Sequence, residues 1–166
     1  MNPVTTMVTT PAQLKAHINA IIQTCLQEIA KETEEYLKIY VETLWYGDHF
    51  PDRYQRTFQF LNSITKSEIE MKGNKMNVAI YFDTSKITPN FLGNGEWNQH
   101  MGFNGQPFVD GLIETIENGN PSPYSPSYAR GGIGMLKETS KWLEKELPRI
   151  AKRVFEKYGL HIIYVV

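Results

Sequence analysis

Few residues in this sequence could perform chemistry, and they are widely separated along the chain. The four histidines are His17, His49, His100 and His161, and no two of them have the spacing that places a pair of metal ligands on one face of a helix. The sequence also contains no HExxH or CxxC motif. It therefore predicts no metal site.

The strongest combination for hydrolysis places a histidine between carboxylates, where it could act as a general base without a metal. The residues that could contribute are Asp48, His49, Asp52, Asp83 and His100. In the alternative interpretation, the first two aspartates form turns and the histidines are polar surface groups. We favour this alternative and expect a protein that is not an enzyme, has no catalytic residue and needs no cofactor.

The only cysteine, Cys25, stands in helical register with Ile18, Ile22 and Ile29, which predicts a buried thiol and not a nucleophile. A single cysteine cannot form an intrachain disulfide, so we expect folding in a reducing cytoplasm. The glycine-rich stretches GNGEWNQ and ARGGIG lack the lysine of a phosphate-binding loop, and we expect both to be turns.

A series of basic residues advances by threes and fours between positions 137 and 157 and could follow a phosphate backbone. The four that could face DNA are Lys141, Lys145, Arg149 and Arg153. Glutamates are interleaved, however, and steps of four wind around a helix of 3.6 residues per turn. A solvated helix face is the favoured interpretation, and DNA contact is the alternative.

The overall balance of charge and hydropathy excludes several classes of protein. Seventeen Lys and Arg against eighteen Asp and Glu give a net charge of -1, so no global field attracts nucleic acid or an acidic membrane. No apolar run approaches the ~20 residues of a membrane span, and the first residues lack the features of a signal peptide. We expect one folded domain over 13–166, preceded by a flexible arm over 1–12.

The hydrophobic pattern indicates an α+β fold, in which a long N-terminal helix and a C-terminal helix pack on a small, mainly antiparallel β-sheet. Apolar residues at helical spacing predict one helix between Pro11 and Gly47, longer than a domain of this size needs. The runs TKSEIEM and KMNVAIYFD around Gly73 and Asn74 predict a β-hairpin, with Met76, Val78, Ile80 and Phe82 facing the core.

The second half of the sequence predicts two long loops and two helices. The loops cover 84–106 and 119–134 and flank a short helix that begins near Pro107 and ends at Gly119. The last helix covers Met135–Tyr158, with a kink at Pro148 and a stop at Gly159. The closing LHIIYVV predicts an apolar strand that joins the sheet or another subunit.

The segment RYQRTFQFLNSI ahead of the hairpin resembles a motif of phage head-tail joining proteins, a family related to tail-completion and minor tail proteins. In that family an Arg-Thr pair, a spaced Leu and a Ser-Ile pair precede a two-stranded ribbon. The matching residues here form a structural box, namely Arg56, Thr57, Leu61, Ser63 and Ile64. Glu117, Asn118 and Gly119 are a looser version of the family's Glu-Gly-Thr signature.

This resemblance implies a structural component of the virion neck, assembled in the bacterial cytoplasm, that forms a ring, expected to be a hexamer, between head and tail. Its neighbours would be head-closure and tail-terminator or tail-tube proteins, with DNA passing nearby. The tail terminator of the same neck is the alternative role, and a small hydrolase or nuclease is the alternative class. The candidate residues for subunit contact are aromatic or polar, namely Phe91, Trp97, His100, Phe103 and Tyr164.

Overall fold

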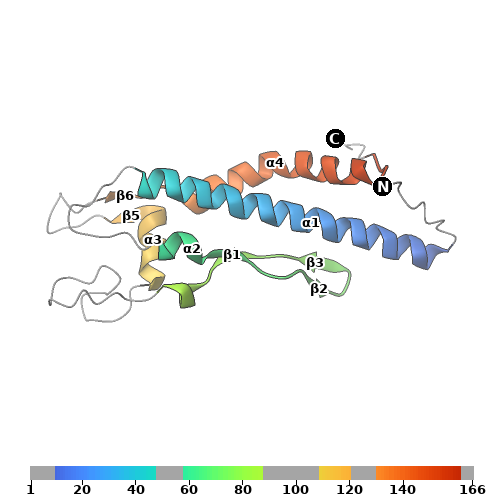
Figure 1. The fold of residues 1–166 in the computed structure, drawn as a ribbon, viewed down its shortest axis with the longest axis horizontal. Helices are drawn as coiled ribbons and strands as arrows, with labels where there is room; N and C mark the ends of the chain where they lie inside the picture. The colour runs from blue at the N-terminus through green and yellow to red at the C-terminus, as the bar shows by residue number, and fades with distance from the viewer. Residues whose placement is uncertain (1–9, 48–57, 88–108, 121–129, 162–166) are drawn as a thin grey trace.

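The fold consists of two long antiparallel helices and a narrow β-ribbon, which lies on the opposite side of the longer helix from its helical partner (Figure 1). The computed structural model describes residues 10–47, 58–87, 109–120 and 130–161. The longer helix, α1, covers Pro11–Val41, and its partner, α4, covers Met135–Lys157. The predicted α+β class is confirmed.

Helix α1 begins where the sequence provides a complete N-terminal cap. The Thr10 hydroxyl accepts a hydrogen bond from the backbone N–H of Gln13, and the Gln13 side chain accepts one from the N–H of Thr10, at 3.3 and 3.2 Å. Pro11 is the first helical residue, as expected, so the helix starts inside the segment 1–12 that the sequence predicts as an arm. A π-helical turn, Glu42–Tyr46, extends the helix to Gly47.

The partner helix α4 lies along α1 and is joined to it by specific contacts. The rings of Tyr36 and Trp142 stack with centroids 4.5 Å apart, and Arg153 forms an ion pair with Glu32. Ile150 and Val154 are almost completely buried. Pro148 lies inside the helix, and Gly159, with a φ of 72°, ends it as predicted.

The β-ribbon follows a single helical turn, α2, at Gln59–Ser63. Strands β1 (Ile64–Lys66) and β4 (Ile80–Phe82) form its first half, and strands β2 (Glu70–Lys72) and β3 (Lys75–Asn77) form its far end, both antiparallel. Lys72 pairs with Lys75 across Gly73 and Asn74, so the predicted hairpin is confirmed. The ribbon lies along α1 for much of its length (Figure 1).

A hydrophobic core cluster lies where the second half of α1 meets the start of the ribbon. Its buried members come from every layer, namely Leu37, Val41, Phe60, Ile64, Ile87, Ile116 and Met135. Ile80 and Phe82 pack against this cluster as predicted, and Phe82 stacks on Phe60 with ring centroids 5.0 Å apart. Met76 and Val78 are half-buried and their neighbours Asn77 and Ala79 are exposed, so the two lie on the inner face of the ribbon as predicted, although outside this cluster.

The beginning of the loop expected over 84–106 is instead part of the packed structure. Thr84–Lys86 form a short 3₁₀ turn, and Asp83 caps it by accepting hydrogen bonds from the backbone N–H and hydroxyl of Ser85. Ile87 is only 4% exposed because it inserts into the hydrophobic cluster. Because the residues that follow are rich in Asn, Gly and Pro, the sequence predicts a loop here and does not reveal that Ile87 is buried. Residues 88–106 lie outside the described residues.

The loop expected over 119–134 is also ordered at both ends. Helix α3 (Val109–Asn118) runs into strand β5 (Gly119–Asn120), which pairs with strand β6 (Arg130–Gly131). The backbone N–H groups of Ile133 and Gly134 then donate to the carbonyl oxygens of Ile116 and Glu117. Gly119 pairs with Gly131 in this ladder. The sequence therefore has no alternation of apolar and polar side chains that would predict these two strands.

Glu117 caps helix α4 from outside that helix. Its carboxylate accepts hydrogen bonds from the backbone N–H groups of Leu136 and Lys137, at 2.7 and 3.3 Å. The N-cap position itself is Gly134, which has a φ of 59° and no side chain to offer. A carboxylate at a helix N-terminus satisfies free N–H groups and interacts favourably with the helix dipole. Glu117 therefore joins α3 to α4.

Both ends of the segment 48–57 are held at one place. Tyr46, in the π-helical turn, stacks on Phe58 with ring centroids 4.8 Å apart. Phe58 has a φ of 54°, which is uncommon for a residue other than glycine. The stacked pair therefore holds Tyr46 and Phe58 close together in space.

Replacing Gly132 by Ala should destabilise the junction between α3 and α4. A Cβ at this position would meet backbone atoms of Glu117, Asn118 and Gly119 at 2.3 to 2.4 Å, so the two segments would have to separate. We expect a loss of roughly 1 to 3 kcal/mol in the free energy of unfolding, measured by urea titration. The matched control is Gly131→Ala, because a Cβ there has nothing within 4 Å. Equal midpoints for the two variants would contradict this packing.

Candidate functional site

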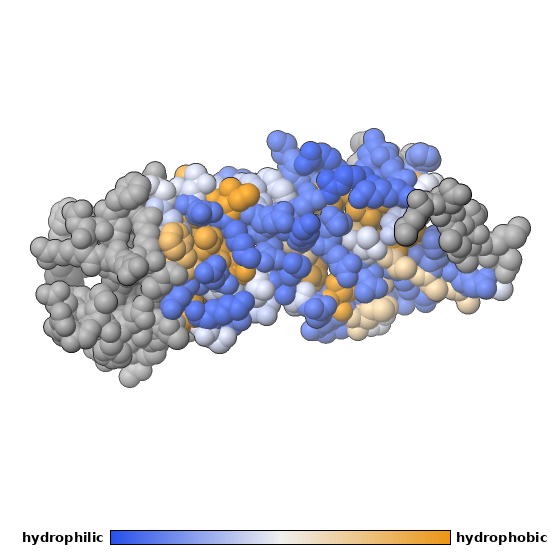
Figure 2. Space-filling model, viewed as in Figure 1, coloured by the Kyte–Doolittle hydropathy of each residue, from blue (hydrophilic) through white to orange (hydrophobic). Residues whose placement is uncertain are grey.

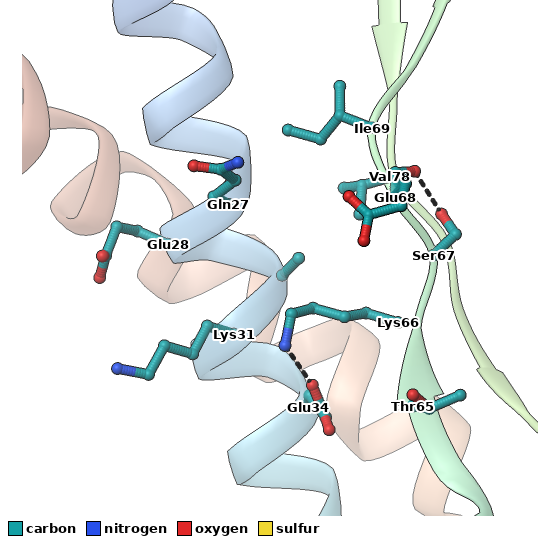
Figure 3. A pocket seen from close by; sticks show the side chains of 11 residues that line it. Gln27, Glu28, Lys31, Glu34, Thr65, Lys66, Ser67, Glu68, Ile69 and Val78 are labelled. Atoms are coloured by element: carbon teal, nitrogen blue, oxygen red, sulfur yellow. Dashed lines mark hydrogen bonds and ion pairs between the residues drawn. The ribbon is translucent and has the colours of Figure 1, made fainter.

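A groove between α1 and the ribbon is a cavity within the described residues at which a ligand or partner could bind. It has a volume of about 490 Å³ and is open to solvent. Figure 3 shows α1 on one side of it and the ribbon on the other, with the side chains of Lys66 and Glu34 meeting between them. The lining residues are Gln27, Glu28, Ala30, Lys31 and Glu34 of α1, and Thr65, Lys66, Ser67, Glu68, Ile69 and Val78 of the ribbon.

Glu34 lines this groove and forms two ion pairs there. Its two carboxylate oxygens accept from the ammonium groups of Lys38, at 2.6 Å, and Lys66, at 2.7 Å. Lys38 stands one helical turn further along α1, whereas Lys66 comes from β1. The side chain of Glu34 is only 14% exposed, whereas those of Lys38 and Lys66 are 37% and 39% exposed. Glu34 therefore ties the ribbon to the helix.

The pKa of Glu34 is the result of two opposing effects. Desolvation by burial raises the pKa, but the hydrogen bonds and positive charges of Lys38 and Lys66 outweigh it, so the pKa is lowered from its ordinary value of 4.5. A carboxylate with a lowered pKa that is occupied by two lysines is a weak general base. The geometry favours a structural role for Glu34.

The rest of the groove is amphipathic. Ile69 and Val78 form an apolar wall on the ribbon, opposite Ala30 of α1. The Ser67 hydroxyl accepts from the backbone N–H of Ala79, at 3.0 Å, and donates to the carbonyl of Glu68, at 2.8 Å (Figure 3). A groove with an apolar wall, charged groups of both signs and a strand along one side is suited to an extended peptide.

Of the hydrolytic combination considered from the sequence, Asp83 alone lies in the described part of the chain. Asp83 is engaged in capping the turn at Ser85, and its pKa is lowered, first by the hydrogen bond from the Ser85 hydroxyl. His17 and His161 are exposed. Among the described residues, no group of three or more His, Cys, Asp or Glu could hold a metal ion. Asp48, His49, Asp52 and His100 lie outside the described residues.

Cys25 is a core residue, as predicted. It is 5% exposed, and burial raises the pKa of its thiol, so little of it is present as the reactive thiolate.

The basic series on α4 is largely neutralised by neighbouring carboxylates. Lys141 pairs with Glu138 at 2.6 Å, Arg149 pairs with Glu146 at 2.5 Å, and Arg153 pairs with Glu32 of α1. Of the four residues considered for DNA contact, Lys145 alone has no ion pair within the described part of the chain. Paired charges of both signs are typical of a solvated helix face, which was the favoured interpretation.

A comparison with sequence models of protein families gives a match over most of the chain. A sequence model of the YomN family matches residues 11–157, from the first residue of α1 to the last residue of α4. The chain belongs to the YomN family. This is a phage-derived family, so the expected phage origin is supported. No curated protein and no solved structure matches the chain.

Within the family match, the described part of the structural box has a packing role. Ser63 is fully buried, and its hydroxyl donates to the carbonyl of Phe60 at 2.7 Å. Ile64 is 1% exposed and belongs to the hydrophobic cluster, against which Leu61 packs. Arg56 and Thr57 lie outside the described residues.

The residues considered for subunit contact are not described by the structure. Phe91, Trp97, His100, Phe103 and Tyr164 all lie in the segments 88–108 and 162–166. Of the apolar strand expected at the end of the sequence, Leu160 and His161 are described, and they lie in neither a helix nor a strand. None of the described helices is long and apolar enough to cross a membrane.

Sequence reasoning missed the groove because its two sides come from distant segments. Lys66 lies 32 positions from Glu34, and no periodicity connects them. The pair Glu34 and Lys38 was visible at i,i+4 spacing, but a solvated helix face explains that spacing equally well.

Replacing Glu34 by Gln should lower stability in a pH-dependent manner. Because the folded-state pKa is lowered, the carboxylate stabilises the fold above the ordinary value of 4.5, and this stabilisation is lost as the pH falls through the folded-state pKa. We expect the variant to lose about 1 kcal/mol at pH 7 and little at pH 3, since both lysines are partly exposed.

Urea unfolding at the two pH values measures this difference, and Glu35→Gln is the matched control because Glu35 is exposed on the neighbouring position of α1. A Glu34→Gln variant with the same pH profile as wild type would contradict the role of the ion pairs.

Proposed function

We propose that this phage-derived chain is a structural subunit of the phage neck, which assembles into a ring and joins the head connector to the tail. Membership of a phage-derived family supports a phage protein. The resemblance of the box ahead of the ribbon to a motif of head-tail joining proteins is the support for that type. The observation that carries the proposal is that the strand edges of the ribbon are open among the described residues. In this role the chain would act by holding neighbours together and not by catalysis.

The ribbon presents strand edges that can accept another chain. Each of its two pairs, β1 with β4 and β2 with β3, has no third strand among the described residues. A two-stranded ribbon is only marginally stable by itself, so packing on α1 must support it. An open edge beside an amphipathic groove can bind an extended segment of a neighbour through backbone hydrogen bonds, with the groove receiving its side chains.

Contacts of this kind are heterologous, because the strand edge of one subunit meets a different segment of the next. Heterologous contacts that close by rotation generate a ring. We propose a hexamer around the DNA channel, with head-closure and tail-terminator or tail-tube proteins as neighbours. Tail completion is the role we favour, and tail termination in the same neck is the alternative.

Blocking the ribbon edges should abolish assembly and leave the fold intact. Across a two-residue turn, Lys72 and Lys75 form a hydrogen-bonded pair, so the N–H groups of the next pair, Met71 and Met76, point to the outer edges. Met71→Pro and Met76→Pro each remove one outward N–H and no ladder bond. We expect wild-type rings in negative-stain images and light scattering, and monomers for the variant that blocks the contact edge.

The matched controls are Met71→Ala and Met76→Ala, which shorten the same side chains and keep the N–H groups. Assembly by both proline variants, or a wild-type protein that stays monomeric at all concentrations, would count against the ribbon contact. Electron microscopy of whole particles tests the location separately, because a neck subunit should appear as sixfold density between head and tail.

A further inference from the structure

The ribbon carries one extra residue on the strand that lines the groove. The two ladders end at the pairs Lys66–Ile80 and Glu70–Asn77, so three residues, 67–69, lie opposite two, 78–79. An insertion of this kind is a β-bulge, which changes the direction of the side chains on its strand and is common beside functional sites. All three residues of the bulge line the groove.

Ser67 fixes the backbone of this bulge. Its N–H donates to the carbonyl of Ala79 at 2.8 Å, and its hydroxyl accepts from the N–H of Ala79 at 3.0 Å. The same hydroxyl donates to the carbonyl of Glu68 at 2.8 Å. These bonds satisfy polar groups that the interrupted ladder would leave free. They therefore hold Glu68 at a defined position beside the groove.

Glu68 brings an uncompensated negative charge to the ribbon side of the groove. Figure 3 shows its carboxylate turned toward α1. It forms no ion pair with any described residue, whereas Glu34 is engaged by two lysines. Glu28 and Lys31 also line the groove, but they carry opposite charges and point away from the ribbon (Figure 3).

Apolar side chains surround the approach to this carboxylate. Ile69 and Val78 of the ribbon are half-buried, and Ala30 of α1 lies across the groove from them. Figure 2 shows small hydrophobic patches among hydrophilic surface where the ribbon lies along α1. Lys and Arg combine an aliphatic stem with a charged head, so they suit a site with an apolar wall and a carboxylate.

We infer that the groove receives a long basic side chain, Lys or Arg, from an extended segment of a neighbouring subunit. Its stem would pack on Ile69, Val78 and Ala30, and its head would pair with Glu68. An acidic segment would be repelled by Glu68, and a wholly apolar segment would cover this carboxylate without a partner, which is costly. The inference rests on the ribbon contact proposed above for its partner, but not for the charge that selects the side chain.

Binding of two short peptides tests this inference. The probes are acetylated and amidated Thr-Val-Arg-Val-Thr and the same peptide with neutral citrulline in place of arginine. Methyl signals of Ile69 and Val78 in the full chain report binding by nuclear magnetic resonance. Because Glu68 is exposed, we expect a modest preference, with the arginine peptide binding about fivefold more tightly. Glu68→Gln should make the two affinities equal.

The matched control is Glu70→Gln, which removes the same charge two residues along. Glu70 pairs with Lys72 and does not line the groove, so this variant should keep the preference for arginine. Equal affinities of the two peptides for wild type would overturn the inference, as would an unchanged preference in Glu68→Gln. Methyl signals of Ile69 and Val78 that do not shift at millimolar peptide would also overturn it.

The same measurements separate this inference from the proposed ring. A wild-type protein that stays monomeric and prefers arginine would contradict the ring and support the basic side chain in the groove. If rings form, the titration uses whichever of Met71→Pro and Met76→Pro prevents them, so that no neighbour occupies the groove. Equal affinities in that variant would overturn the inference and leave the ring unaffected.

Discussion

The structure depends on the packing of two different layers onto one helix. Helix α4 lies on one side of α1 with the stacked rings of Tyr36 and Trp142, and the ribbon lies on another side with the ion pair of Glu34 and Lys66. Neither a two-stranded ribbon nor a single helix is stable alone in water. The length and straightness of α1 therefore determine where every other element lies, including the groove.

The strength of these attachments varies along α1. Around Leu37 and Val41 the helix meets the hydrophobic cluster, to which α2, α3 and the start of α4 all contribute. Further toward the N-terminus the ion pair of Glu34 and Lys66 holds the ribbon to α1, and Ile69 and Val78 are only half-buried. Among the described residues, those of the cluster are thus more firmly held than the far end of the ribbon, which is better able to adjust to a neighbour.

The sequence predicted the elements well and their connections poorly. Helix α1 was visible from apolar residues at steps of three and four with Pro11 and Gly47 at its ends, and the hairpin from the alternation around Gly73. These are local signals. Ile87, the glycine ladder of β5 and β6 and the capping of α4 by Glu117 are contacts between distant segments, and no spacing in the sequence encodes them. The groove belongs to this second group.

The burial of Cys25 has a practical consequence. The chain contains one thiol, and that thiol lies on α1 in the part that α4 covers, with a pKa raised by burial. A reagent can reach it only when the two helices separate, so its reaction rate reports the equilibrium of that opening in the way that hydrogen exchange reports it for an amide. The reaction rate of Cys25 in the wild-type protein therefore measures how readily α1 and α4 separate.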